Sequence, residues 1–145
     1  MVFLMSKTTR KGGCLCGAVR YETPWPPAML LTCACTNCQK QSGGAISVVA
    51  AVARDALKCT GTLKTYTDTG ASGKNVYREF CPDCGSAVLT DTDAAREGGM
   101  IFLKAGTLDE TRDLKPTIHC WSISGQDWLT YPEGDTVMEK QEGLG

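Results

Sequence analysis

Short apolar or alternating stretches, separated by glycine, proline and polar turns, run along most of this chain. Alternation with a period of two predicts strands that bury one face. The stretch 46–53 is apolar and rich in β-branched residues but short for a helix, so we expect a buried strand there. Strands are predicted at 18–21, 29–32, 46–53, 57–59, 63–67, 75–80, 86–90, 100–104 and 117–123. Many short strands at roughly regular spacing indicate a mainly β or strand-dominated α+β fold.

Glycine and proline mark the expected connections between these strands. The segment 23–27 holds three prolines and predicts a loop, because proline cannot donate to a sheet ladder. Thr60-Gly61 lies between two strand segments and is a hairpin-like signal. Gly43-Gly44 breaks the chain, and 91–97 can form one helical turn.

Length and charge fit one ordinary domain. The chain has 145 residues and a formal net charge of -1, with its lysines and arginines scattered. This is not the charge pattern of a nucleic-acid-binding protein. No repeat, low-complexity tract or linker divides the sequence, so we expect a loosely ordered segment at 1–10 and a single β domain at 11–145.

The sequence also indicates the compartment. The longest near-apolar run, 46–53, falls far short of the roughly 20 residues that a membrane helix needs, so no membrane partner is expected. Nine cysteines is an odd number, so they cannot all pair within the chain. Closely spaced cysteines in a chain of this length favour metal binding over a disulfide framework. We therefore expect a cytoplasmic protein, and its oligomeric state stays open.

Four of the clustered cysteines form two closely spaced pairs. Cys81 and Cys84 lie in Phe80-Cys-Pro-Asp-Cys-Gly85, a spacing typical of a zinc-binding turn. The alternative for this pair is a redox Cys-x-x-Cys motif, which belongs at a helix N-terminus in a βαβ unit. Cys14 and Cys16 lie between two glycines, and their alternative role is that of two buried structural thiols. Two such pairs can together supply one four-sulfur structural zinc site, worth on the order of 10 kcal/mol.

A third cluster places Cys33, Cys35 and Cys38 within six residues. Three cysteines can bind one zinc ion and leave a fourth position open, as catalytic zinc sites do. Cys59, Cys120 or His119 could instead close the site, or one of the three could remain a free thiol. The polar segment after the cluster is interpreted as a ligand-contacting turn, with a solvated loop as the alternative.

These motifs together resemble a known family. They are Gly13-Cys-Leu-Cys-Gly17, the run Cys-x-Cys-x-x-Cys-Gln-Lys-x-Ser-Gly at 33–43, Phe-Cys-x-x-Cys-Gly-Ser at 80–86, and Pro116-x-x-His119 with Trp128 downstream. Over about residues 11–135 the sequence resembles the glutathione-dependent formaldehyde-activating enzymes, a family that includes centromere-protein-V-like proteins.

The resemblance implies a fold of several short, coiled antiparallel β-sheets, called a β-tent. It implies a structural zinc on Cys14, Cys16, Cys81 and Cys84, and a second, open zinc site on Cys33, Cys35 and Cys38 close to a glutathione site. Such an open site can be only partly occupied. Candidate substrate contacts are Gln39, Lys40, Ser42 and His119.

Two positions depart from the family pattern. Ala34 stands where the family usually has a histidine, and alanine can donate neither a hydrogen bond nor a proton. Cys120 stands where a β-branched aliphatic residue is common. Since neighbouring residues of a strand face opposite sides, His119 and Cys120 cannot both face one site.

The resemblance implies a reaction in which the thiolate of glutathione adds to formaldehyde and gives S-(hydroxymethyl)glutathione. In reverse, this is a carbon–sulfur lyase reaction. Catalytic residues are not assigned, because no general base is evident. The alternative is a zinc-stabilised thiol-binding or interaction module without catalysis, and Ala34 supports it.

Overall fold

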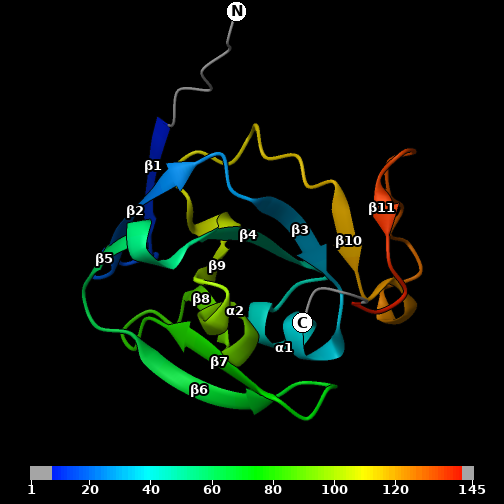
Figure 1. The fold of residues 1–145 in the computed structure, drawn as a ribbon, viewed down its shortest axis with the longest axis horizontal. Coiled ribbons are helices and arrows are strands. Elements are labelled where there is room, and N and C mark those ends of the chain that lie inside the picture. The colour runs from blue at the N-terminus through cyan, green and yellow to red at the C-terminus, as the bar shows by residue number, and fades with distance from the viewer. Residues whose placement is uncertain (1–7, 142–145) are drawn as a thin grey trace, which may run out of the picture.

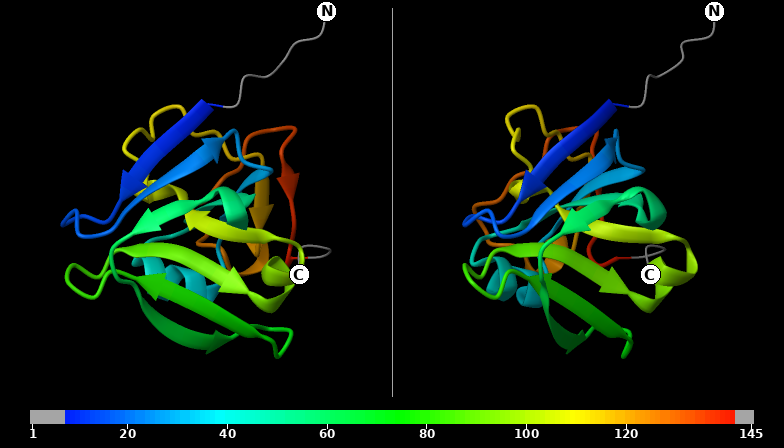
Figure 2. Two further views of the ribbon diagram at one scale, coloured as in Figure 1. Left: turned by 60° about the vertical axis from the view of Figure 1, so that its left-hand side comes forward. Right: turned by 90° about the vertical axis from the view of Figure 1, so that its left-hand side faces the viewer.

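The computed structural model describes residues 8–141, and these form a mainly β fold, as the sequence predicts. Within this range the strands form two sheets (Figures 1 and 2). The smaller sheet has the order β1-β2-β5, and the larger sheet has the order β11-β10-β3-β4-β9-β8-β7-β6. The strands are β1 (Thr8–Gly13), β2 (Arg20–Trp25), β3 (Met29–Cys33), β4 (Ser47–Ala53), β5 (Lys58–Thr60), β6 (Lys64–Thr69), β7 (Asn75–Phe80), β8 (Ala87–Thr92), β9 (Met100–Lys104), β10 (Ile118–Cys120) and β11 (Thr136–Val137).

Two short α-helices and three single-turn 3₁₀ segments complete the fold. The α-helices are α1 (Thr36–Ser42) and α2 (Asp93–Glu97), and the 3₁₀ segments are η1 (Arg54–Ala56), η2 (Ala105–Thr107) and η3 (Ser122–Ser124). Helix α1 ends at Gly43, whose φ of 69° lies in the left-handed region that glycine adopts easily. None of the helices in the described part of the chain is long and apolar enough to cross a membrane.

Alternate residues of the larger sheet face two different clusters of buried side chains. Ala50 and Leu103 face the smaller sheet and pack in one cluster with Val19 and Tyr21. Val49 points the other way, into a second cluster that contains Cys33 and Cys38. This division follows from the two-residue period of a strand.

Helix α1 lies on the second face of the larger sheet. In Figure 1 the sheet curls around this helix, with β3 and β4 on one side and β6 and β7 below it. Asn37 of α1 donates a hydrogen bond to Asp68 of β6 at 3.0 Å, which links the helix to that end of the sheet. The curvature therefore brings strands from both ends of the sheet to one helix.

Most strands follow the sequence prediction, and most sheet pairings are antiparallel as expected. The strands β3, β4, β7, β8 and β9 lie within one or two residues of their predicted positions. Strand β10 is shorter than predicted, and it pairs parallel with both β3 and β11.

The loop prediction for 23–27 is wrong in part, because β2 continues to Trp25 and contains Pro24. Strand β5 pairs with β2 only at Arg20–Glu22, so beyond that point β2 has one neighbour, β1. Proline is tolerated in such a one-sided strand, because its missing N–H can face away from the ladder.

The hairpin prediction around Thr60-Gly61 is also wrong. Strand β5 joins the smaller sheet and β6 joins the larger one, so the chain crosses between the sheets at this point. The predicted polar turn after the third cysteine cluster is helix α1 instead.

The N-terminal segment is partly outside the described range. Residues 8–10 belong to β1 and pair with β2, whereas 1–7 lie outside the described residues. The part of the predicted loose segment at 1–7 therefore lies outside the described residues.

The crossing at Gly61 gives a stability prediction. Gly61 has a φ of +95°, and a Cβ there would lie 2.3 Å from the carbonyl oxygen of Ala18. Gly73 has a similar φ of +81°, but a Cβ there meets no atom within 4 Å. Both alanine substitutions strain the backbone, and only Gly61→Ala adds a clash, so it should cost about 1–3 kcal/mol more in free energy of unfolding. Chemical denaturation of the two variants measures this, and equal losses would contradict the close approach at Gly61.

Candidate metal centres

The first group of cysteines joins the two sheets. Cys14 and Cys16 follow β1 of the smaller sheet, and Cys81 and Cys84 lie between β7 and β8 of the larger one. All four Sγ atoms lie within 4.8 Å of one another. The structure therefore brings together the two pairs that the sequence places 65 residues apart.

Both pairs are held in tight turns that end in a glycine. Gly17 has a φ of 82° and donates its N–H to the carbonyl oxygen of Cys14 at 3.1 Å. Gly85 has a φ of 78° and donates to the carbonyl oxygen of Cys81 at 2.8 Å. Because a positive φ strains other L-residues, these glycines allow the chain to turn directly behind the sulfur atoms. The amide of Val19 donates to Cys14 Sγ at 3.2 Å, an interaction that favours a thiolate.

The spacing of the sulfur atoms fits a tetrahedral zinc ion. Cys14 and Cys16 Sγ lie 3.6 Å apart, and Cys16 and Cys81 Sγ lie 3.8 Å apart. Four thiolates at a Zn–S distance of about 2.3 Å in a tetrahedron would lie about 3.8 Å from one another. The residues present can therefore hold a four-coordinate zinc.

Electrostatics at this group also favour a cation. Hydrogen bonds from Ser86, whose hydroxyl lies 3.2 Å from Cys84 Sγ, lower the pKa of Cys84 to about 5. For Cys16, a hydrogen bond from the amide of Ala18 lowers the pKa, but the adjacent Cys14 sulfur opposes it, and the net result is a pKa of about 12. Sulfur atoms this close cannot all ionise unless a positive charge lies between them.

The second group lies where β3 passes into α1. Cys33 ends β3, Cys35 is the N-cap residue of α1, and Cys38 lies in its first turn. The Cys35 sulfur accepts a hydrogen bond from the amide of Cys38 at 3.2 Å, as an N-cap side chain does. The three Sγ atoms lie within 4.8 Å of one another, and Cys35 is the most exposed of the three.

No fourth His, Cys, Asp or Glu among residues 8–141 meets the same spacing around this group. Cys59 is exposed on β5 of the other sheet. Cys120 lies opposite Cys33 in the β10–β3 register and packs in the same buried cluster, but it is not one of the three grouped ligands. The three sulfurs therefore form an open set of ligands.

The three thiols of this group differ in their pKa values. Hydrogen bonding from Cys33 and Cys35 lowers the pKa of Cys38 to about 2. Hydrogen bonding with Cys35 and then with Cys38 raises the pKa of Cys33. Without a metal, the group therefore holds one thiolate at Cys38, stabilised by the thiols of Cys33 and Cys35. A metal ion that binds all three sulfurs would displace the two remaining thiol protons.

His119 has other partners. Its Nδ1 lies 2.8 Å from Thr32 Oγ1, and its Nε2 lies 2.8 Å from Asp135 Oδ2. Its ring also stacks against Tyr131 with centroids 4.6 Å apart. Both ring nitrogens are therefore engaged in contacts that join β3, β10 and the segment before β11.

The three polar residues proposed as substrate contacts lie on α1. Gln39 donates from Nε2 to the carbonyl oxygens of Ala34 at 2.8 Å and Ser124 at 3.0 Å. Lys40 and Ser42 are exposed. Gln39 thus fixes the backbone around the second cysteine group, whereas Lys40 and Ser42 remain accessible.

Sequence reasoning missed two charged residues beside the second group, Arg78 and Lys104. Both are buried, with exposed fractions of 5% and 6%, and both interact electrostatically with Cys38. Each lies in a correctly predicted strand, β7 or β9. A charged residue within an otherwise buried strand pattern was the available signal.

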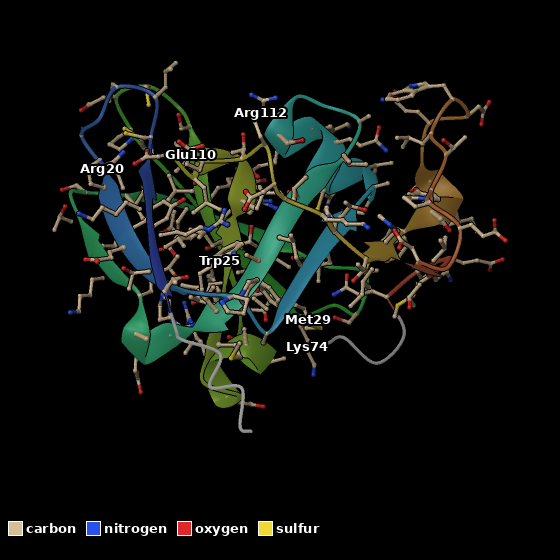
Figure 3. All side chains as sticks on the ribbon, turned by 90° about the horizontal axis from the view of Figure 1, so that it is seen from above. Arg20, Trp25, Met29, Lys74, Glu110 and Arg112 are labelled. Carbon is tan, nitrogen blue, oxygen red and sulfur yellow. The ribbon has the colours of Figure 1, made fainter. Side chains whose placement is uncertain are left out.

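A separate hollow of about 360 Å³ lies on the side of the molecule where β2 leads into β3. Trp25 and Met29, both labelled in Figure 3, line it together with Arg10 and Asp113, which form an ion pair. No cysteine contributes to its lining. This hollow therefore does not belong to either cysteine group.

Comparisons with known proteins found one matching family model and a similar solved structure. A family model described as glutathione-dependent formaldehyde-activating enzyme matches residues 9–124. A crystal structure of a Rhodobacter sphaeroides protein is similar, with 19% sequence identity and a TM-score of 0.55, and the alignment covers 71% of this chain and 91% of that one. At this identity the likeness shows the fold alone. No curated protein matches the chain.

The four-sulfur group gives a second prediction. Cys84→Ser should lose one zinc ion and much of the fold, because a structural zinc supplies on the order of 10 kcal/mol of apparent binding free energy. Cys59→Ser is the matched control, since Cys59 is exposed and outside both groups. Cys84→Ser should bind one zinc ion fewer and unfold at a lower temperature than wild type. Cys59→Ser should match wild type in both zinc content and melting temperature. Zinc loss with an unchanged melting temperature would contradict a structural role.

Proposed function

The chain belongs to the glutathione-dependent formaldehyde-activating enzyme family, and from this premise we propose that it is a zinc-dependent carbon–sulfur lyase acting on a small thiol adduct. The observation that carries the proposal is the open set of three sulfurs at Cys33, Cys35 and Cys38. The adduct is one that a thiol such as glutathione forms with formaldehyde or a similar small aldehyde.

The reaction balances without a redox partner. In the synthetic direction the thiolate sulfur forms a bond to the carbonyl carbon, the carbonyl π electrons move to oxygen, and that oxygen takes up a proton. In the lyase direction the hydroxyl loses its proton, the carbonyl re-forms, and the carbon–sulfur bond breaks to release the thiolate. The protein has to hold the sulfur, orient the carbonyl and move one proton.

The three cysteines are suited to holding that sulfur. A zinc ion bound to them would supply an electrophilic centre with one position left for a substrate thiolate. Cys33 and Cys38 are buried, whereas Cys35 is half-exposed, so a substrate would approach from the side of Cys35. Gln39 supports this arrangement, because its hydrogen bond to the Ala34 carbonyl ties α1 to the end of β3.

Ala34 gives the site no side chain that can donate a proton to the substrate. Its side chain is buried, its amide donates to the Cys120 carbonyl at 3.0 Å, and its carbonyl accepts from Gln39 and from the hydroxyl of Ser124 at 2.9 Å. The position therefore anchors backbone and supplies no proton donor. We propose that the proton exchanges with water on the Cys35 side.

A second candidate is a zinc-stabilised thiol-binding or interaction module without catalysis. It is favoured by the apolar side chain at Ala34 and by the engagement of both His119 nitrogens with Thr32 and Asp135. The two candidates share the proposed zinc ions and a small thiol as partner. Both suit a reducing compartment such as the cytoplasm, because the clustered cysteines are reduced thiols.

Steady-state assays with glutathione adducts of small aldehydes test the lyase proposal. Cys35→Ser should lower kcat/KM by about 100-fold or more, because it removes one ligand of the open site. Cys59→Ser should leave the rate unchanged. Equal rates in wild type and Cys35→Ser would end the lyase proposal, and wild-type binding of glutathione without turnover would favour the module.

A further inference from the structure

Two buried cations lie on the face of the larger sheet that carries the second cysteine group. Cys33 of β3 pairs with Ser47 of β4, and Lys104 of β9 pairs with Val49, two residues further along β4. Residues two apart on a strand share a face, so Cys33, Ser47 and Lys104 lie on the same side. Arg78 reaches this side from β7 through the pairings of β8 and β9.

Hydrogen bonds fix both cations. Lys104 Nζ donates to Ser47 Oγ at 2.7 Å. Arg78 Nε donates to Asp68 Oδ2 at 2.9 Å, and the same oxygen accepts a bond from Asn37 of α1. The Nη1 of Arg78 is buried and has no acceptor within hydrogen-bond distance in the described part of the chain, and the guanidinium of Arg78 interacts with the sulfur of Cys38. The site therefore contains a buried N–H donor that has no oxygen or nitrogen acceptor among residues 8–141.

Both cations interact with the sulfur group. Burial lowers the pKa of Lys104, and the negative charge of Cys38 opposes that shift. The positive charge of Arg78 also lowers it, and Cys33 and Cys35 oppose the shift more weakly. Burial acts in the same direction on Arg78, but Cys38 and Asp68 raise the pKa of Arg78 above its usual value. Keeping two cations buried is costly unless negative charge lies beside them.

A count of formal charges separates their roles. Arg78 and Asp68 form an ion pair and cancel. A zinc dication with three thiolates carries one net negative charge. Lys104 forms no ion pair with a carboxylate among residues 8–141, so its charge balances the occupied site. A fourth ligand that is a thiolate then leaves one net negative charge, whereas it would leave two without Lys104.

We propose that Lys104, positioned by Ser47, is the residue that lets the three-cysteine site accept an anionic fourth ligand, a thiolate, in preference to a neutral one. Arg78 supports it by offering its unpartnered Nη1 to a sulfur atom. This rests on the proposed zinc site, and it adds the charge class of the ligand and the residue that selects it.

The test uses the full chain with cobalt(II) in place of zinc, because cobalt absorption reports changes in the ligand set. Glutathione, 2-mercaptoethanol and imidazole are titrated separately into wild type and variants. Lys104→Met removes the charge, and Lys104→Gln removes it while keeping a group that can bond Ser47. Lys104→Arg retains the charge, and Lys58→Met removes a lysine from β5 of the other sheet, where its side chain is exposed.

We expect the two neutral variants to weaken thiol binding by about tenfold or more and to leave imidazole binding unchanged. Lys104→Arg and Lys58→Met should behave like wild type. Equal weakening for thiols and imidazole, or no change in either neutral variant, would overturn the proposal. So would a wild-type site that binds imidazole but neither thiol.

These titrations separate this proposal from the proposed function. If 2-mercaptoethanol binds with the predicted dependence on Lys104 but glutathione does not, the assigned thiol is wrong and the charge selection stands. If both thiols bind as predicted without turnover of their aldehyde adducts, the lyase proposal fails and the selection again stands. If Lys104→Met does not fold, Lys104→Gln carries the comparison.

Discussion

Sulfur atoms held a few ångströms apart cannot all be thiolates unless a positive charge lies between them, and this constraint applies to both cysteine groups of the molecule. At Cys14, Cys16, Cys81 and Cys84 it operates between the two sheets, so that whatever neutralises the sulfurs also holds the sheets together. At Cys33, Cys35 and Cys38 it operates within one short segment, and buried Lys104 and Arg78 lie beside it. The first group therefore connects distant parts of the chain, and the second creates a local charged site.

The two groups differ in what surrounds them, and this difference suggests different roles. Backbone amides, a serine hydroxyl and two glycine turns hold the four-sulfur group, and although Cys16 is exposed, a full set of four ligands leaves no position for a substrate. Among residues 8–141 the three-sulfur group has no fourth ligand, and its Cys35 is half-exposed. This difference in ligand number is the reason that we place the proposed chemistry at the three-sulfur group. Ala34, at the position where the sequence resemblance implies a histidine, gives this site no proton donor of that kind.

The sequence predicted those features that depend on local pattern. Strands such as β4 and β9 have alternating or apolar runs that specify them without reference to the rest of the chain, and cysteine spacing predicted the clusters within each segment. The chemistry of a four-sulfur zinc site predicted that the two distant pairs come together. Other features that depend on distant partners were missed. Pro24 is accommodated because β5 does not extend to it, and β5 and β6 do not pair because β5 pairs with β2 and β6 pairs with β7.

Helix α1 is short and polar, and its limits are set by the Cys35 cap and by Gly43 rather than by an apolar period. Arg78 and Lys104 could be seen as unusual in their strands, but only the register of five strands, β3, β4, β9, β8 and β7, shows that they face the cysteines.

Native mass spectrometry of the wild-type chain, purified with its metal, tests the central claim that both sulfur groups are metal centres and that only one is open. The account predicts a folded species with two zinc ions, to which one molecule of glutathione adds. It also predicts that mild chelation removes one zinc ion together with the capacity to bind glutathione, while the fold persists. A folded chain that carries no metal, or one that binds glutathione equally well without the second ion, would contradict it.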